Sequence, residues 1–435
     1  MDACARSAMG RVGTLAALCC LLAGCGRGVE SLPTFYPGDT QPPTSGPDVP
    51  GVEAMDRAVR ALLKTWNVPG AAVAVARDGK LILARGYGYA DFEARQPVQP
   101  TSRFRIGSTS KVLTAMAVLH LREQGLLDLE RPFLQYLPQF QLPPGADARL
   151  PAVTLRQLLH HSGGWDRDLR GDPLDLQREI SSALGVPTPV MCSDVFRYQL
   201  GKHLDFEPGT RFDYSNFGYC ILGLVVEAVS GRPLELYVRD SVLAPMGVNA
   251  MSIGYSHLAE RGTEEVRYYD WDGAPLADSL FPGEDQVPLV YGAFDPMTFA
   301  AAGGWIGSAV DLTRIFSAID GSRTAPFLSD GSRGEWLEDP HLPGISGAWY
   351  GLGIFVRTRP DRWWHGGSLF GGQTLLVHDE AGNDFAIVTN SRTGDPDGFS
   401  ADETNAVFAG LVSLTGAAED LYPQFPSPPV PPRSR

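Results

Sequence analysis

Lysine is scarce in this chain, and basic residues nowhere form a run. Four of the 435 residues are lysine, namely Lys64, Lys80, Lys111 and Lys202, and the formal net charge at pH 7 is −14. A surface that binds nucleic acid needs clustered lysine and arginine, so this composition argues against a nucleic-acid partner. The same scarcity makes each lysine more informative about function.

Several catalytic motifs are also missing. The chain has no H-E-x-x-H sequence and no dense group of histidine and cysteine, so we expect neither a metal nor another cofactor. It has no G-x-S-x-G sequence either, which excludes the nucleophile elbow of an α/β-hydrolase.

No stretch reaches the 18 consecutive apolar residues that a membrane-spanning helix requires. The start of the chain instead resembles a bacterial lipoprotein signal, with Arg6 and Arg11 before the apolar run Val12–Leu22. Cys25 follows Leu-Ala-Gly, as in the lipobox. We therefore predict a signal peptide over 1–24 and a lipid anchor at Cys25. The anchor would hold an exported protein on a membrane of the bacterial cell envelope; a plain cleaved signal is the alternative.

The two ends of the mature chain lack hydrophobic periodicity. Residues 25–50 are rich in proline, glycine, serine and threonine and predict a flexible tether. The proline-rich residues 419–435 predict a disordered tail. Residues 51–418 between them predict the folded domain, for which the sequence indicates no oligomeric state.

Cysteine is too rare to predict a disulfide framework. After the signal and Cys25, only Cys192 and Cys220 remain. They could pair in an oxidising compartment. Cys220 lies in an apolar run, however, and this favours two separate buried thiols.

Hydrophobic periodicity places strands towards both ends of the domain and helices between them. Strand patterns occur at 71–76, 81–89, 351–357, 374–377 and 385–390. Helical patterns occur at 52–66, 108–124, 216–229, 309–319 and 401–414. We therefore predict an α/β fold in which an antiparallel sheet built from both chain ends is flanked by helices, with an all-α insert at roughly 125–300.

The most informative motif is Ser108-Thr109-Ser110-Lys111, the only S-x-x-K in the chain. At the start of a helix, residues three apart share one face, so the lysine amine can reach the Ser108 hydroxyl. A serine becomes a strong nucleophile when a neighbour removes its proton, and a lysine of lowered pKa can do so. The alternative is a capping serine before a surface lysine, which the apolar residues 112–118 disfavour.

The second motif is Tyr214-Ser215-Asn216, the only Y-x-N, directly before a predicted helix. A phenol whose proton is drawn off by neighbouring cations can act as a base, and an amide can orient a substrate carbonyl. A core tyrosine followed by a capping asparagine is the structural alternative.

The third motif is H-x-G, which occurs at His365 and at His161. His365 lies between strand patterns, where Gly366 and Gly367 would let the backbone approach a substrate closely. The N–H of Ser368 could then be the second oxyanion donor, after the N–H groups at the start of the Ser108 helix. His161 lies in a pattern typical of a helix end and a tight turn, so we interpret it as structural.

These three motifs, in this order, resemble those of the serine β-lactamase and penicillin-binding protein superfamily. The tyrosine of the second motif points to the branch that holds class C β-lactamases, DD-carboxypeptidases, D-aminopeptidases and related esterases. The stretches 158–164, 207–219 and 303–312 agree with that branch. The resemblance covers roughly residues 52–415 and implies the fold and a serine hydrolase.

The resemblance also implies roles for individual residues. Ser108 is the nucleophile, and Lys111 and Tyr214 share the acid and base work, in an order that the sequence leaves open. Asn216 holds a substrate amide. His365 stands where many β-lactamases have a lysine, and it orients the proton network or a substrate carboxylate. Gly367 and Ser368 belong to the substrate-binding strand.

The histidine at 365 affects the expected reaction. An imidazole binds a carboxylate less strongly than a fixed ammonium does, so it favours a peptidase or an esterase over efficient β-lactam hydrolysis. The expected substrate is a small molecule or a peptide with an amide or ester bond. The alternative function is a non-catalytic descendant that binds peptidoglycan or a partner. The loops at 165–189 and 254–296 are expected to rim the site.

Overall fold

The computed structural model describes residues 31–323 and 326–431. In chain order, the strands of its main sheet are β1 (Thr44–Ser45), β2 (Gly70–Arg77), β3 (Lys80–Asp91), β4 (Gln96–Pro97), β10 (Trp349–Tyr350), β11 (Phe355–Thr358), β12 (Asp361–Leu369), β13 (Gly372–Asp379) and β14 (Asn383–Thr389). Shorter strands form two further sheets: β5 (Phe104–Arg105), β9 (Trp305–Gly307) and β6 (Ser252–Ile253), and then β7 (Leu276–Asp278) with β8 (Gln286–Pro288).

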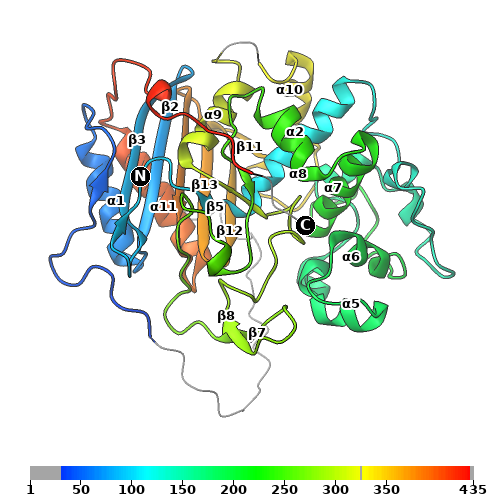
Figure 1. Ribbon diagram of the computed structural model, residues 1–435. Helices are drawn as coiled ribbons and strands as arrows, with labels where there is room; N and C mark the ends of the chain where they lie inside the picture. The colour runs from blue at the N-terminus through cyan, green and yellow to red at the C-terminus, as the bar shows by residue number, and fades with distance from the viewer. Residues whose placement is uncertain (1–30, 324–325, 432–435) are drawn as a thin grey trace.

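The helices pack on both faces of the main sheet and form a lobe beside it (Figure 1). They are α1 (Glu53–Thr65), α2 (Ser110–Glu123), α3 (Leu155–Leu159), α4 (Arg167–Arg170), α5 (Gln177–Leu184), α6 (Cys192–Gln199), α7 (Asn216–Ser230), α8 (Leu234–Tyr237), α9 (Ala309–Ile319), α10 (Asp330–Leu337) and α11 (Pro396–Leu411).

The main sheet has nine strands in the order β1-β3-β2-β14-β13-β12-β11-β10, with β4 paired to β3. Strand β2 near the start of the domain pairs with β14 near its end, with Val75 opposite Phe385 and Val73 opposite Ile387. The prediction of an antiparallel sheet assembled from both chain ends is therefore confirmed.

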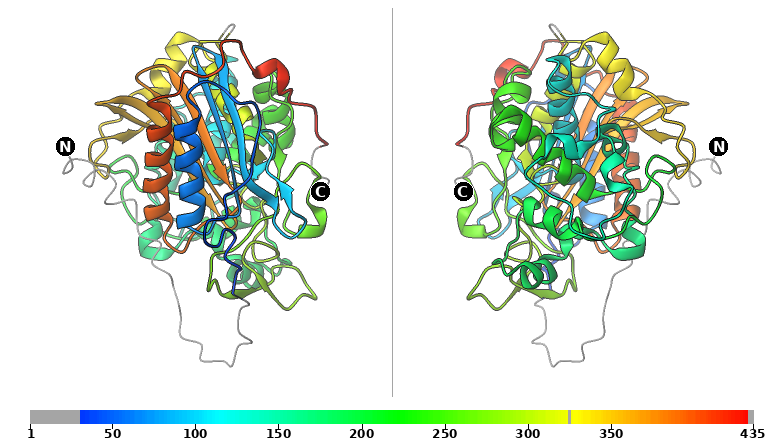
Figure 2. Two further views of the ribbon diagram at one scale, coloured as in Figure 1. Left: turned by 90° about the vertical axis from the view of Figure 1, so that its left-hand side faces the viewer. Right: turned by 90° about the vertical axis from the view of Figure 1, so that its right-hand side faces the viewer.

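Helices cover the two faces of this sheet differently. Figure 2 shows α1 and α11 lying side by side over one face. Helix α1 presents Met55, Val59 and Leu62 inwards at helical spacing, and all three are buried. Helix α9 packs against β14 and β2. Because helices cover both faces, the central strands β2 and β14 are buried along almost their whole length and consist mainly of small and β-branched residues.

The insert is mostly helical, as predicted. Helices α3 to α8 form the lobe beside the sheet, and helix α7 runs through its centre. The Ser215 hydroxyl caps α7 by accepting a hydrogen bond from the Gly218 N–H, and Gly231 ends the helix in the left-handed conformation. The short strands β6, β7 and β8 occupy the last part of the insert, which the all-α prediction did not include.

The prediction of a flexible tether is wrong for residues 31–50. Phe35 and Tyr36 are buried, and the Phe35 N–H donates a hydrogen bond to the Asn67 side chain. Strand β1 pairs with β3, with Thr44 opposite Tyr87. Two buried aromatic side chains and an edge-strand pairing therefore order a segment whose overall composition is that of a linker.

The prediction of a disordered tail is wrong for residues 419–431. Leu421 and Tyr422 are buried against the domain. The Ser427 hydroxyl accepts hydrogen bonds from the Asn249 and Ala250 N–H groups at 2.8 and 2.9 Å. These few contacts fix the segment on the surface, and its regular structure is limited to the short 3-10 helix Tyr422–Gln424.

The predicted signal peptide over 1–24 and the lipid anchor at Cys25 lie outside the described residues and stay predictions. Within residues 31–323 and 326–431, no single helix is long and apolar enough to cross a membrane, and only the bent pair Asn216–Ser230 and Leu234–Leu243 meets that criterion jointly.

Cys192 and Cys220 form a disulfide with Cα atoms 5.8 Å apart, so the preference for separate thiols is wrong. Cys192 begins α6, and Cys220 lies in the second turn of α7. The apolar run around Cys220 indicated burial correctly, but burial does not exclude a bond to a neighbouring helix.

We predict that this bond stabilises the domain. It closes a loop with a sequence separation of 28 residues, for which the chain-entropy estimate is about 3–4 kcal/mol. The double variant C192S/C220S should lose about that much unfolding free energy in a urea titration. Without reductant, the intact mass of the wild type should be lower than its reduced mass by two hydrogen atoms. An unchanged mass on reduction would contradict the bond.

Candidate active site

Two backbone segments meet at Ser108. The serine lies in a short 3-10 helix, Gly107–Thr109, that leads into α2. Gly107 has a φ of +50°, and a Cβ placed there would lie 2.8 Å from the Ser368 N. A Cβ on Gly367 would lie 2.0 Å from the Ile106 carbonyl oxygen. Both positions therefore require glycine, and the two glycines let β12 pass directly against the nucleophile turn.

This close approach brings two backbone N–H groups to the site. The ideal Cβ position of Gly367 is 3.1 Å from the Ser108 N, so the 3-10 turn that carries Ser108 lies directly against the part of β12 that carries Ser368. Two such donors beside a serine hydroxyl are the arrangement that stabilises an oxyanion. The structure thus brings together Ser108, Gly367 and Ser368, although 260 positions separate the first and last of them in the chain (368 − 108).

Lys111 is fully buried in the first turn of α2. Its Nζ lies 3.2 Å from the Ser108 Oγ, 2.6 Å from the Asn216 Oδ1 and 2.6 Å from the Ala302 carbonyl oxygen. A charged ammonium has three protons for these three acceptors. A neutral amine has two, which suit the two shorter contacts, and its lone pair then faces the serine hydroxyl. The surface-lysine alternative is excluded by this burial.

The surroundings of Lys111 favour the neutral amine. Burial lowers the pKa of Lys111 well below its usual range, and the charge of Arg167 lowers this pKa further, whereas the charge of Asp172 opposes both. The ring centroid of Tyr214 lies 4.8 Å from Nζ.

Tyr214 completes the hydrogen-bonding group around the nucleophile. Its phenol is hydrogen-bonded to Ser108, and burial raises the pKa of Tyr214 despite this bond and the charge of Arg167. A phenol with a raised pKa keeps its proton at neutral pH and acts as a donor. Tyr214 and Lys111 therefore both contact the Ser108 hydroxyl. The phenol keeps its proton, whereas the amine has lost one.

Asn216 is held in one orientation by an aspartate that sequence reasoning missed. The Asn216 Nδ2 donates to the Asp172 Oδ2 at 2.7 Å, which leaves its Oδ1 to accept from Lys111. The Asp172 Oδ1 accepts from the Leu174 N–H, so the carboxylate is itself fixed. Asp172 lies in the loop at 165–189, which the sequence analysis expected at the rim of the active site. That expected position is the sequence signal that could have identified Asp172.

Arg167 is the second residue that was missed. It begins α4 in the same loop, and its guanidinium carbon lies 4.7 Å from the centre of the Tyr214 ring. Its positive charge lowers the pKa of both Lys111 and Tyr214. Arg167 and Asp172 thus act on the same lysine with opposite sign.

His365 lies within strand β12. The sequence analysis had placed it between two strands, and that placement is wrong. It is 1% exposed. Its Nδ1 lies 2.6 Å from the Gly366 carbonyl oxygen, so Nδ1 carries the proton, and its Nε2 accepts from the Tyr350 hydroxyl at 2.9 Å. Burial lowers the pKa of His365 to about 3, and the neighbouring Lys111 contributes to this lowering when it is protonated. The imidazole is therefore neutral at physiological pH.

His161 has the packing role that was expected, but it packs against a catalytic candidate. Its ring centroid lies 4.2 Å from that of Tyr214 and 4.6 Å from that of Tyr350. Its Nδ1 accepts from the Ser215 N–H at 3.1 Å. His161 therefore fixes both the Tyr214 ring and the backbone that precedes α7.

Comparison with known proteins concerns the family and the fold. The sequence model of the Beta-lactamase family matches residues 55–409. Esterase EstB from Burkholderia gladioli is 31% identical over 282 residues, which cover 61% of this chain and 69% of the esterase. Protein flp from Staphylococcus aureus (strain N315) is 28% identical over 194 residues, or 45% of this chain. The match spans only 36% of the length of Protein flp.

A solved structure extends the likeness to the fold. The octameric penicillin-binding protein homologue from Pyrococcus abyssi superposes with a TM-score of 0.63 and 25% identity, covering 82% of this chain and 77% of that one. The arrangement of sheet and helical lobe is therefore shared with a protein of similar size.

We predict that Arg167 and Asp172 move the pH profile in opposite directions. Arg167→Gln removes a positive charge and should raise the pKa of Lys111, which moves the acidic limb of kcat/KM to higher pH. Asp172→Asn removes a negative charge and should move it to lower pH. Each shift should be about one pH unit, measured with a chromogenic ester.

Arg170→Gln is the matched control, because Arg170 lies on the same short helix but is exposed and pairs with Asp205. It should leave the profile in place. Shifts of the same sign in R167Q and D172N would mean that Lys111 is not the titrating group.

Proposed function

Because this chain belongs to the β-lactamase family, we propose that it is a serine hydrolase that cleaves an ester or amide bond through an acyl-enzyme on Ser108. The observation that carries the proposal is that the Ser108 hydroxyl contacts both an amine that can accept a proton and a phenol that can donate one. Lys111, with its lowered pKa, and Tyr214, with its raised pKa, both meet the Ser108 side chain.

These protonation states favour Lys111 as the base in the proposed mechanism. The neutral Lys111 amine takes the proton of Ser108 as the serine oxygen bonds to the substrate carbonyl carbon. The carbonyl oxygen becomes an oxyanion beside the N–H groups of Ser108 and Ser368. When the carbon–oxygen or carbon–nitrogen bond breaks, the Tyr214 hydroxyl gives its proton to the leaving group and recovers one from the Lys111 ammonium. In deacylation, water takes the place of the leaving group and passes a proton through Tyr214 to Lys111 as its oxygen bonds to the acyl carbon. The Ser108 oxygen then leaves and takes the proton back from the Lys111 ammonium, which releases the acid.

Asn216 and His365 would serve this cycle in different ways. Asn216 is tied to Lys111 and Asp172, so we propose that it fixes the amine and that its exposed edge meets the substrate amide. His365 uses both ring nitrogens within the protein, and its neutral state removes the charge that would hold a carboxylate. We propose that it fixes Tyr350 and the strand that leads to Ser368.

The neutral His365 also bears on the substrate. A site without a fixed cation on this strand has less need for a substrate carboxylate. This favours simple esters and peptide-like amides, in line with the esterase among the relatives. Efficient β-lactam hydrolysis ranks below them.

A penicillin-type β-lactam tests the nucleophile directly. Residues 27–435 mixed with the lactam should gain one adduct by intact mass spectrometry, and peptide mapping should place it on Ser108. Ser108→Ala should show no adduct and lose at least about a thousandfold in esterase rate. Ser110→Ala is the matched control, because the Ser110 hydroxyl is buried and accepts a hydrogen bond from the Trp305 backbone N–H. This variant should keep both the adduct and the esterase rate.

The outcomes separate the candidate functions. Rapid loss of lactam without an adduct indicates a β-lactamase. Ester turnover without any reaction with the lactam indicates an esterase. Retention of ester turnover by S108A contradicts the acyl-enzyme. Absence of any turnover or adduct favours the non-catalytic descendant that binds peptidoglycan or a partner.

A second prediction concerns the neutral histidine. His365→Gln should lower kcat/KM by disturbing Tyr350 and β12, but it should move the acidic limb of the pH profile by less than about half a unit. The reason is that an imidazole with a pKa of about 3 does not titrate in this range. Measurement of ester hydrolysis from pH 5 to 9 checks this. A lost or strongly shifted limb would identify His365 as the titrating group instead.

A further inference from the structure

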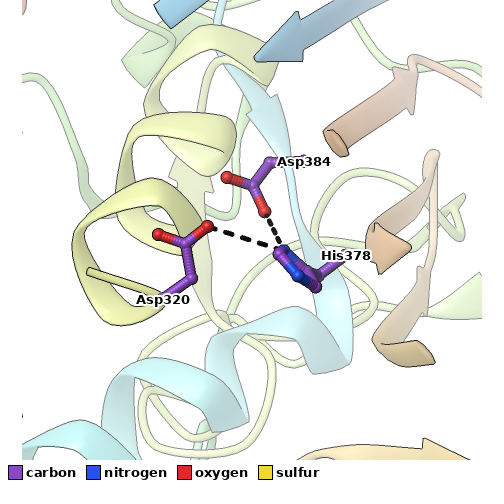
Figure 3. Close-up of side chains that lie close together, drawn as sticks. All are labelled: Asp320, His378 and Asp384. Atoms are coloured by element: carbon purple, nitrogen blue, oxygen red, sulfur yellow. Dashed lines mark hydrogen bonds and ion pairs between the residues drawn. The ribbon is translucent and has the colours of Figure 1, made fainter. Parts of the chain in front are cut away.

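A histidine and two aspartates converge outside the catalytic group (Figure 3). His378 and Asp384 are directly opposite each other on β13 and β14, and Asp320 stands at the end of α9. The His378 Nδ1 lies 2.8 Å from the Asp384 Oδ1 and 3.6 Å from the Asp320 Oδ2. Three elements thus direct three potential metal ligands at one point, and these ligand atoms all lie within 4.8 Å of one another.

Each carboxylate is oriented by a separate hydrogen bond. The Ser317 hydroxyl donates to the Asp384 Oδ2 at 2.6 Å. The Ser322 N–H donates to the Asp320 Oδ1 at 2.7 Å. One oxygen of each aspartate is therefore held by the protein, while the other faces the imidazole. Outer hydrogen bonds of this kind orient the ligands of metal sites.

The two carboxylates approach the same ring nitrogen. A single Nδ1–H can make a good hydrogen bond to Asp384, but Asp320 at 3.6 Å is beyond that range. His257 provides the contrast. Its Nδ1 lies 3.1 Å from the Glu260 carboxylate and its Nε2 lies 3.0 Å from the Glu284 carboxylate, so the two acids lie at different nitrogens on opposite sides of the ring. The His257 group has no common centre for an ion.

A surface pocket of about 410 Å³ adjoins the imidazole of this cluster. His378 lines it together with Trp363, Asp379 and Glu380. The His378 ring is stacked on Trp363 with ring centroids 4.4 Å apart, which fixes its plane. An acidic, open pocket beside a fixed imidazole favours the entry of a cation and supplies water for the remaining coordination positions.

We propose that His378, Asp320 and Asp384 bind one divalent transition-metal ion through Nδ1, Oδ2 and Oδ1, and that Zn²⁺ suits this set of one nitrogen and two oxygens. Zinc takes imidazole and carboxylate ligands at about 2.0–2.2 Å and completes four-coordination with water. The ion displaces the proton of Nδ1. It would fasten the end of α9 to the β13–β14 hairpin, independently of Ser108.

Zinc binding by the untagged chain tests this site. After chelator treatment and dialysis, the wild type equilibrated with Zn²⁺ should hold one ion per chain by elemental analysis. Its thermal unfolding midpoint should rise. His378→Gln should weaken binding at least about a hundredfold, and its unfolding midpoint should no longer respond to Zn²⁺.

Two further variants keep the test sharp. Asp320→Asn keeps the size and shape of a side chain at a helix end, so we expect it to preserve the fold if H378Q does not, and it should also weaken binding. His257→Gln should bind Zn²⁺ like the wild type. The proposal fails if wild type and H378Q hold the same amount of zinc, or if H257Q loses the ion instead. With Co²⁺ as the probe, the wild type should show a visible absorption band that H378Q lacks.

Discussion

The burial of one lysine amine organises the catalytic centre. Lys111 lies in an apolar helix, and its hydrogen bonds within the described residues go to three neutral acceptors: the Ser108 hydroxyl, the Asn216 amide and the Ala302 carbonyl. In the proposed mechanism, this keeps the amine available to Ser108 as a base, which a buried carboxylate partner would prevent by raising the lysine pKa. Asp172 stands one hydrogen bond further away and binds Asn216 instead. The positions of α2, α7 and the loop before α5 are therefore all constrained by one nitrogen.

The parts of the site that the sequence could reveal are those held by local geometry. Ser108 and Lys111 lie one helical turn apart, and Tyr214 and Asn216 flank a capping serine, so their motifs are short and readable. Arg167 and Asp172 reach the same centre from another loop without a motif of their own. The zinc ligands combine a six-residue hairpin spacing with Asp320 on α9, and no metal-site pattern in a single segment describes that combination.

The fold shows the same division. Apolar runs and helical patterns predicted the sheet from both chain ends, because β2 and β14 must bury both faces. The terminal segments were misjudged because composition averages over residues. Phe35 and Tyr36 are two positions among many prolines, yet their burial is enough to fix the segment. The disulfide was missed because nothing near Cys192 in the sequence indicates that α6 lies against α7.

The meeting of Gly107 with Gly367 couples chemistry to the completeness of the fold. One oxyanion donor comes from the first third of the chain and the other from the last fifth, and neither is positioned until β12 has joined the sheet. A partly folded chain therefore contains the nucleophile but no place to develop negative charge. In the proposed mechanism, catalytic competence therefore requires β12 to be in place beside Gly107, so turnover would report on molecules in which this part of the sheet is complete.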